Sequence, residues 1–313
     1  MLIISLKQMA VLAIFIMIGF TVSKLKAVGP EAAGVLSKLE STVFIPALVM
    51  GTFITNFTTE KLGATWKILL FSTGITVIGI FISILCAKIA SRDRYIQKIY
   101  TYGLAFANFG FMGIPIVSAL FPQYEMYYII FTLPLWTFIY VWGVPSLLMG
   151  KEGSSVRDKL KALVNPMFIA LLIGALIGIS GLKMPDFIVS AVNTCGSCMS
   201  PLAMIITGMT FANMNVKKVL SDKSIYFISV VRLIVLPLLF GGVYLLVTKL
   251  LSLDVPEYFF ICMLCARAMP LGLNTVVVPA AYGKDTSVAA GMALISHAIS
   301  IITIPVILTL FGL

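Results

Sequence analysis

The stretch that decides the fold runs from Asn108 to Pro115 and reads Asn-Phe-Gly-Phe-Met-Gly-Ile-Pro. It lies within an apolar segment long enough to cross a membrane, where two glycines and a proline favour a break in the helix. A second stretch of this kind runs from Arg267 to Asn274, in the other half of the chain, and reads Arg-Ala-Met-Pro-Leu-Gly-Leu-Asn. Each stretch therefore predicts an interrupted membrane helix.

The composition around these stretches is that of an all-α polytopic membrane protein. Hydrophobic residues make up 60% of the chain and charged residues 11%, whereas soluble proteins have about 45–50% and about 25%. The apolar runs are continuous rather than alternating, which excludes a membrane β-barrel. The net charge of +10 is scattered through short loops, so we expect a lipid bilayer as partner and no nucleic acid.

The apolar runs, bounded by charged residues, Pro and Gly, predict ten membrane-spanning helices. Each run is close to the ~20 residues that cross the hydrocarbon core of a bilayer. The first run follows Lys7 as in a signal peptide, but it has a counterpart at 166–181, so we interpret it as a helix of the mature protein. The predicted spans are 6–23, 34–56, 66–90, 97–120, 125–148, 162–181, 191–213, 224–247, 256–280 and 286–311.

The distribution of Lys and Arg predicts the orientation in the membrane. Basic residues concentrate in the odd-numbered connections between spans, which are therefore expected to be cytoplasmic. Both termini are then outside, in a multi-pass protein of a bacterial-type inner (plasma) membrane. The basic residues of these connections are Lys24, Lys26, Lys38, Lys88, Arg92, Arg94, Lys98, Lys151, Arg157, Lys159, Lys161, Lys217, Lys218, Lys223 and Lys284.

An internal repeat relates the two halves of the chain, 1–155 and 156–313, each with five predicted spans. An odd number of spans per repeat places the second half upside down relative to the first. Inverted repeats of this kind are typical of secondary transporters, whose substrates bind near the middle of the membrane where discontinuous helices meet. Three pairs of prolines share one separation in sequence: Pro30 and Pro185, Pro46 and Pro201, and Pro115 and Pro270.

The two breaks supply the candidate substrate-binding residues. The Asn108 amide is suited to a hydrogen bond with a substrate carboxylate, or alternatively to a hydrogen bond between helices. Arg267 is costly inside a membrane, and we expect no Asp or Glu deep in any span, so a bound anion is a candidate partner. The alternative is that Arg267 donates to the carbonyls of the broken helix. Gly110, Gly113 and Asn274 complete this set.

Two further polar residues lie within predicted spans. The long side chain of Arg232 is expected to reach the cytoplasmic face, with a role in substrate binding or coupling as the alternative. His297, the only histidine, is a candidate proton relay, or else a polar group satisfied within the bundle. A proton is preferred over sodium as the coupling ion, because His297 could relay a proton and we expect no acidic group deep in a span to hold sodium.

The chain has no motif of a metal site or an enzyme. Its two Cys-x-x-Cys pairs lie in predicted membrane helices without zinc-ribbon turns, so we expect no metal and no cofactor. We find no phosphate-binding loop, nucleophile elbow or metalloprotease helix. We therefore predict a protein that is not an enzyme. The two pairs are Cys195 with Cys198, and Cys262 with Cys265.

The broken fourth span resembles a motif of the auxin efflux carrier family, which includes PIN-type plant auxin transporters and bacterial organic-acid permeases. The resemblance covers essentially the whole chain. It is carried by Asn108-x-x-x-Met112-Gly113-Ile114-Pro115, by Met269-Pro270-x-Gly272, by Tyr282-x-x-Asp285 and by Pro305.

The resemblance implies ten helices in a five-plus-five inverted repeat, as in bile-acid sodium symporters. It implies a scaffold from 1–56 and 162–213, through which members often dimerise, and a transport domain from 66–148 and 224–313 that moves like an elevator. Asn108 would contact the substrate carboxylate, and Pro115 and Pro270 would mark the crossing of the broken helices. The sodium symporters hold their ions with acidic groups near the crossing, which we do not expect here.

From these observations we predict a secondary-active transporter of a small organic anion. Carboxylates such as malate or malonate, or an auxin-like indole acid, are the expected substrates. An anion channel is the first alternative, because discontinuous helices also line channel filters. A membrane ligand sensor without transport is the second.

Overall fold

The computed structural model describes residues 2–149, 164–212, 222–282 and 284–313. The described residues form helices joined by short connections, and each apolar run predicted from the sequence coincides with helical elements. The basic residues of 151–161 and 217–218, which contributed to the predicted orientation, lie outside the described residues.

The first half begins with the long helix α1. The second span is one continuous helical run that includes a π-helical turn, η1, and the fourth span is interrupted between α5 and η3. The elements are α1 (Leu2–Lys24), α2 (Ala32–Leu39), η1 (Glu40–Phe44), α3 (Ile45–Asn56), η2 (Thr59–Lys61), α4 (Leu62–Ala90), α5 (Arg94–Ala105), η3 (Phe109–Gly113), α6 (Ile114–Leu120), η4 (Pro122–Tyr124), α7 (Glu125–Phe138) and η5 (Ile139–Leu148).

The second half follows a similar order and has its own interrupted helix, between α15 and α16. A π-helical turn, η6, lies between α13 and α14. The elements are α9 (Pro166–Ser180), α10 (Asp186–Ser197), α11 (Met199–Ala212), α13 (Lys223–Val230), η6 (Val231–Val235), α14 (Leu236–Leu250), α15 (Glu257–Ala268), α16 (Asn274–Ala281) and α17 (Ser287–Leu310).

Within the described parts of the chain, six helical runs are long and apolar enough to cross a membrane. Several of them expose large apolar side chains, such as Leu70 and Phe81 on α4 and Leu246 on α14. Such exposure is expected where the solvent is lipid rather than water. The six runs are Ala32–Asn56, Thr65–Ala90, Pro122–Leu148, Asp186–Ala212, Lys223–Leu250 and Ser287–Leu310, and shorter apolar helices are Met9–Lys24, Phe109–Leu120 and Pro166–Ser180.

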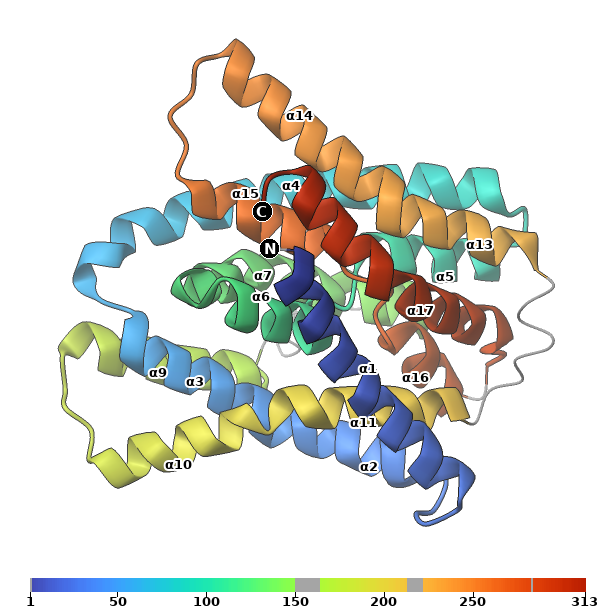
Figure 1. The fold of residues 1–313 in the computed structure, drawn as a ribbon, viewed down its shortest axis with the longest axis horizontal. Coiled ribbons are helices and arrows are strands. Elements are labelled where there is room, and N and C mark those ends of the chain that lie inside the picture. Colours follow the sequence, from blue (N-terminus) through green and yellow to red (C-terminus); the bar gives the residue numbers. More distant parts are fainter. Residues whose placement is uncertain (1, 150–163, 213–221, 283) are drawn as a thin grey trace.

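The helices pack closely on one another, with glycines at some of the contacts. In Figure 1, α2, α3, α10 and α11 lie together in the lower part of the view, and α4, α13 and α14 lie along the upper part. The helix α1 packs along α11, where a Cβ on Gly208 would lie 1.9 Å from the Ile16 carbonyl oxygen. A Cβ on Gly19 would lie 2.0 Å from the Ile205 carbonyl oxygen. Glycine therefore allows these two backbones to touch, as is common between membrane helices.

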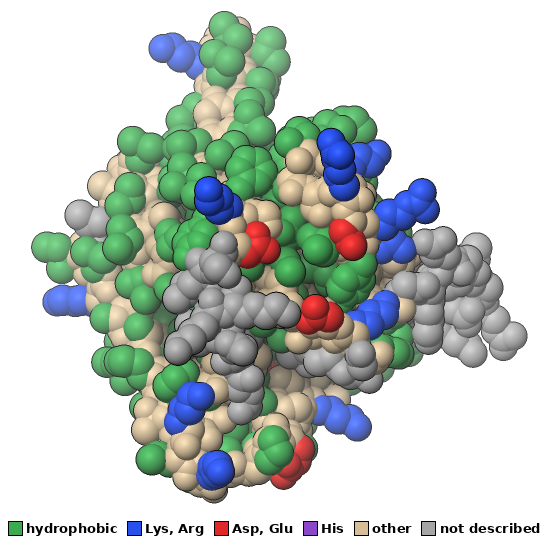
Figure 2. Space-filling view, turned by 90° about the vertical axis from the view of Figure 1, so that its right-hand side faces the viewer, with side chains coloured by type: hydrophobic (Ala, Val, Ile, Leu, Met, Phe, Trp, Pro, Cys, Tyr) green, Lys and Arg blue, Asp and Glu red, His purple; other side chains and the backbone are tan. Residues whose placement is uncertain are grey.

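Charged side chains gather at one end of the molecule. Figure 2 looks onto this end, which lies at the right of Figure 1, and shows Lys and Arg together with a few Asp and Glu. The turns that join α1 to α2 and α4 to α5 lie here. The exposed basic residues of these turns are Lys24, Lys26, Arg92 and Arg94.

Candidate functional site

The two interrupted helices meet each other at their breaks. The helix α5 ends at Ala105 and α15 ends at Ala268, and the chain beyond each is extended. Ala107 and Leu271 form an isolated antiparallel β-bridge, in which the Asn108 N–H donates to the Pro270 carbonyl oxygen over 2.7 Å. This pairing satisfies backbone groups that would be costly to leave free inside a membrane. The expectation that the two breaks face each other is confirmed.

The position of the first break corrects the sequence analysis. The helix is interrupted at Phe106–Asn108, and Pro115 lies beyond it in the first turn of α6. Pro115 does not interrupt the helix there, because α6 continues directly from η3 and the Ile114 N–H still donates to the Phe109 carbonyl oxygen. Of the two prolines expected to mark the crossing, only Pro270 takes part in the backbone pairing.

The glycines of the first stretch lie in η3 and allow aromatic side chains to pack closely. A Cβ on Gly110 would lie 2.7 Å from an atom of the Trp136 ring, and one on Gly113 would lie 2.0 Å from the Tyr128 hydroxyl. That hydroxyl donates to the Phe109 carbonyl oxygen over 3.1 Å. Gly110 lines the cavity at the crossing, whereas Gly113 is not among its described lining residues.

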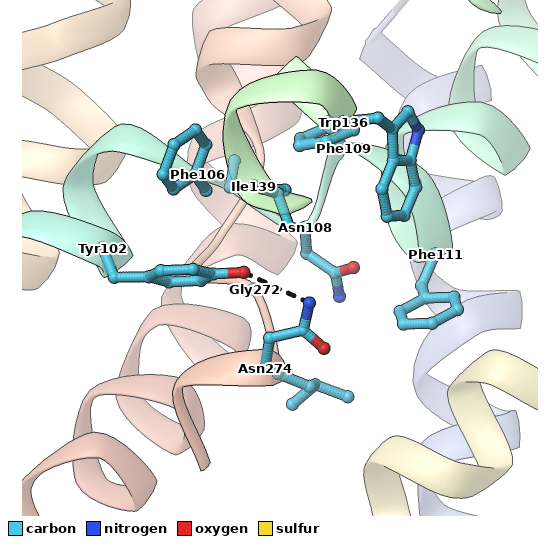
Figure 3. Close-up of a pocket in the computed structure, with 12 residues that line it drawn as sticks. Tyr102, Phe106, Asn108, Phe109, Phe111, Trp136, Ile139, Gly272 and Asn274 are labelled. Atoms are coloured by element: carbon cyan, nitrogen blue, oxygen red, sulfur yellow. Dashed lines mark hydrogen bonds between the residues drawn. The ribbon is translucent and has the colours of Figure 1, made fainter. Parts of the chain in front are cut away.

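A small cavity lies at the crossing, with aromatic and amide side chains around it (Figure 3). Its volume is about 20 Å³, enough for about one water molecule, whereas pockets for small-molecule ligands are typically ~300 Å³ or more. An organic ligand would therefore need this site to open. The lining residues are Tyr102, Phe106, Ala107, Asn108, Phe109, Gly110, Phe111, Trp136, Ile139, Gly272, Leu273 and Asn274.

The Asn108 amide is held in one orientation by His297. The Nδ1 atom of His297 lies 2.7 Å from the Ala293 carbonyl oxygen and must donate to it, which leaves Nε2 as an acceptor in the neutral imidazole. The Asn108 Nδ2 atom lies 3.1 Å from this Nε2 and donates to it. The second N–H of the Asn108 side-chain amide and its Oδ1 atom remain for a ligand.

Asn274 presents a second amide to the same cavity from the start of α16. Its Nδ2 atom donates to the Tyr102 hydroxyl over 3.2 Å. Figure 3 shows the Asn108 and Asn274 side chains projecting toward each other, with Tyr102 and Phe111 on either side. The structure thus brings together Asn108, Asn274 and, through its hydrogen bond, His297.

Arg232 does not reach the cytoplasmic face, contrary to the sequence analysis. Its side chain is fully buried. The guanidinium donates to the carbonyl oxygens of Leu104, Ala266 and Met269 over 2.7, 3.2 and 2.9 Å. These carbonyls lie at the ends of α5 and α15, where helix breaks leave acceptors without partners and the helix dipoles are negative. Arg232 therefore caps both interrupted helices at once.

Arg267 is buried but points away from the cavity. Its Nη2 atom donates to the Ile75 carbonyl oxygen on α4 over 2.8 Å, and its guanidinium lies 4.6 Å from the centroid of the Phe240 ring. Arg267 therefore donates to a backbone carbonyl, as the alternative expected. That carbonyl belongs to α4 and not to the broken helix. Arg267 is absent from the described lining of the cavity.

The sequence analysis missed an acidic residue within a span. Glu40 lies in η1, is only 1% exposed, and its Oε1 atom has no hydrogen-bond partner. The aromatic lining of the cavity, chiefly Tyr102 and Trp136, was also missed. Aromatic residues close to a break, as in Phe106-Ala-Asn108-Phe109, are the signal from which part of this lining could have been found.

Interrupted helices that meet around a buried cavity are typical of membrane carriers, and this is the class that the fold and the site define. The family model described as membrane transport protein matches residues 4–157 and 154–308. The chain therefore belongs to this auxin efflux carrier-like family, as its motifs suggested. An uncharacterized transporter from Methanothermobacter thermautotrophicus is 24% identical over 303 residues, which cover 93% of each chain. Both comparisons indicate transport rather than catalysis.

Proposed function

We propose that this membrane transporter is a secondary-active carrier of a small organic anion, which binds at the crossing of the two interrupted helices. Carboxylates such as malate, malonate or an auxin-like indole acid fit the proposal. The observation that carries it is the meeting of both breaks at one cavity, where two amides and the first turn of η3 converge.

The chemistry of the cavity favours an anion bound by N–H groups. The first turn of η3 has N–H groups without partners in the helix, and the helix dipole places partial positive charge there. Asn108 adds a side-chain N–H, fixed by His297. No charged side chain is among the described lining residues, so these dipoles supply the attraction that Arg267 was expected to supply. The aromatic side chains would contact the apolar part of the ligand.

We propose ten membrane-spanning helices in a five-plus-five inverted repeat, with elevator-type movement. The scaffold would comprise 1–56 and 162–213, and the transport domain 66–148 and 224–313. The packing of α1 along α11 and of α3 along α9 supports the first group, and that of α4 against α5 and α7 supports the second. The narrow cavity at the crossing also supports movement, because it must widen to admit a ligand.

Two larger cavities lie between the proposed domains at different depths along the same helices. One, of about 290 Å³, is lined by Ser37, Ala203 and Asn274 among others, and we call it the inner vestibule. The other, of about 350 Å³, is lined by residues farther along the second span and α6, including Leu48 and Pro115. A ligand could therefore approach the crossing from either side as the domains move.

The proposed orientation places the charged end shown in Figure 2 in the cytoplasm and both termini outside. This follows from the excess of Lys and Arg at that end. The membrane would be a bacterial-type inner membrane, and a homodimer would form through the scaffold helices.

Counterflow in proteoliposomes tests the proposed function. Vesicles loaded with an unlabelled carboxylate should take up the same labelled carboxylate transiently and saturably. The Asn108→Ala variant tests the site, and its apparent affinity for the carboxylate should be lower than that of the parent. A conductance that does not saturate and shows no counterflow would indicate the channel instead. No saturable flux across a broad carboxylate panel would refute the proposal.

A further inference from the structure

Glu40 is a buried carboxyl group beside the proposed binding site. It lines the inner vestibule together with Phe111, Leu273 and Asn274, and these three residues also line the cavity at the crossing. The two cavities are therefore adjacent, and Glu40 borders the cavity that adjoins the crossing. Its backbone belongs to the π-helical turn η1, which interrupts the regular α-helix between α2 and α3.

Within the described part of the chain, the carboxyl group of Glu40 has no partner that would stabilise its charge. The Oε1 atom is buried without a hydrogen bond, and among the described residues no Lys, Arg or His nitrogen lies within 4.0 Å of the carboxyl oxygens. Burial of an unpaired carboxylate is strongly unfavourable. The neutral acid is therefore the form that this packing accommodates.

The charged groups on the neighbouring elements do not change this conclusion. The helices α3, α9 and α11 contact η1 and carry no Asp, Glu, His, Lys or Arg. The helix α2 contributes Lys38, which is exposed at the mouth of the inner vestibule. The helix α10 contributes Cys195 and Asp186, and Asp186 lies at the end remote from η1, because α10 meets α3 with Asn193 beside Gly51.

We propose that Glu40 is a proton-binding site whose protonation is required for an anion to occupy the adjoining cavity. An ionised Glu40 would repel an anion at the crossing, whereas the neutral acid would not. The proton comes from water in the inner vestibule and returns to water when Glu40 ionises, so no other reactant is needed. Binding of anion and proton then favour each other, as linkage requires. This inference rests on the proposed function.

The pH dependence of ligand affinity tests the coupling. The probe is a monocarboxylate such as an indole acid, which is fully ionised from pH 6 to 9, because carboxyl groups in water titrate near pH 4. In the parent protein, affinity should fall by about tenfold per pH unit once Glu40 ionises. The Glu40→Gln variant should bind the probe at every pH with the affinity that the parent shows at low pH. Glu31→Gln, an exposed control before the same helix, should behave as the parent.

Infrared spectroscopy tests the proton site without any ligand. At neutral pH the parent and Glu31→Gln should show the carbonyl band of a protonated, buried carboxyl group, and Glu40→Gln should lack it. Absence of this band in the parent would overturn the proposal. An affinity that does not depend on pH, or a pH dependence that persists in Glu40→Gln, would also overturn it.

Two further outcomes separate this inference from the proposed function. If the parent binds no carboxylate although the infrared band is present, the proposed function fails and the coupling to an anion fails with it, whereas the proton site stands. If affinity depends on sodium rather than on pH, and Glu40→Gln removes that dependence, the group binds a metal cation and the proton assignment is wrong.

Discussion

Arg232 provides a quantitative prediction about the stability of the crossing. The substitution Arg232→Met keeps a long side chain but removes the three donors that reach Leu104, Ala266 and Met269. The carbonyls at the ends of α5 and α15 would then be buried without partners. Water cannot reach them in a site that is fully buried. The three carbonyls therefore lack hydrogen bonds in the folded state only, and the free energy of unfolding decreases.

The magnitude follows from the hydrogen bonds that are lost. Each hydrogen bond to a charged group contributes about 1.5–3 kcal/mol, but removal of the buried guanidinium also relieves its desolvation cost. We therefore expect a net loss of about 3–5 kcal/mol, the range found when one partner of a buried charged network is removed. For a chain of this size that corresponds to a Tm lower by roughly 5–10 °C.

Thermal unfolding in detergent, followed by intrinsic fluorescence, measures this loss. Arg232→Lys should fall between the parent and Arg232→Met, because one ammonium group cannot reach all three carbonyls. Lys249→Met, which changes an exposed residue at the end of α14, is the control and should leave the Tm within about 1 °C of the parent. If Arg232→Met unfolds at the same temperature as Lys249→Met, the role of Arg232 as a shared cap is refuted.

Three further predictions concern the site and its frame. Asn108→Ala should weaken carboxylate binding by about tenfold, the effect of one hydrogen bond, in equilibrium binding; unchanged affinity would exclude Asn108 from the site. Arg267→Gln should leave that affinity unchanged but lower the Tm, because the guanidinium contacts α4 and Phe240; lost affinity in a folded variant would restore the anion role. Gly208→Leu should lower the Tm by forcing α1 away from α11. Gly242→Leu should leave the Tm unchanged, because a Cβ on Gly242 would meet no atom within 4 Å.

The interrupted helices could be predicted from sequence because the local chemistry of Gly, Pro and Asn is nearly sufficient to break a helix in an apolar setting. The register of the first break was wrong, since the new helix already begins at Phe109 and Pro115 lies within it, where the π-helical turn η3 passes into α6. The family motif around Asn108 identified the correct stretch all the same.

The roles of the buried charged groups could not be predicted, because they depend on contacts far apart in the chain. Arg232 reaches carbonyls on two other helices, and nothing in its own span indicates that both helix ends converge there. Glu40 lies close enough to the expected start of its span to be taken for an interfacial residue. Its burial results from packing against other helices, including α9 and α11.

The central claim is that the two breaks together form the substrate site, and a structure with a bound carboxylate tests it most directly. The account predicts ligand density at the crossing, in contact with the Asn108 amide and the first turn of η3, with the cavity wider than its present 20 Å³ or so. Density beside Arg267 and α4, with an empty cavity at the crossing, would contradict it.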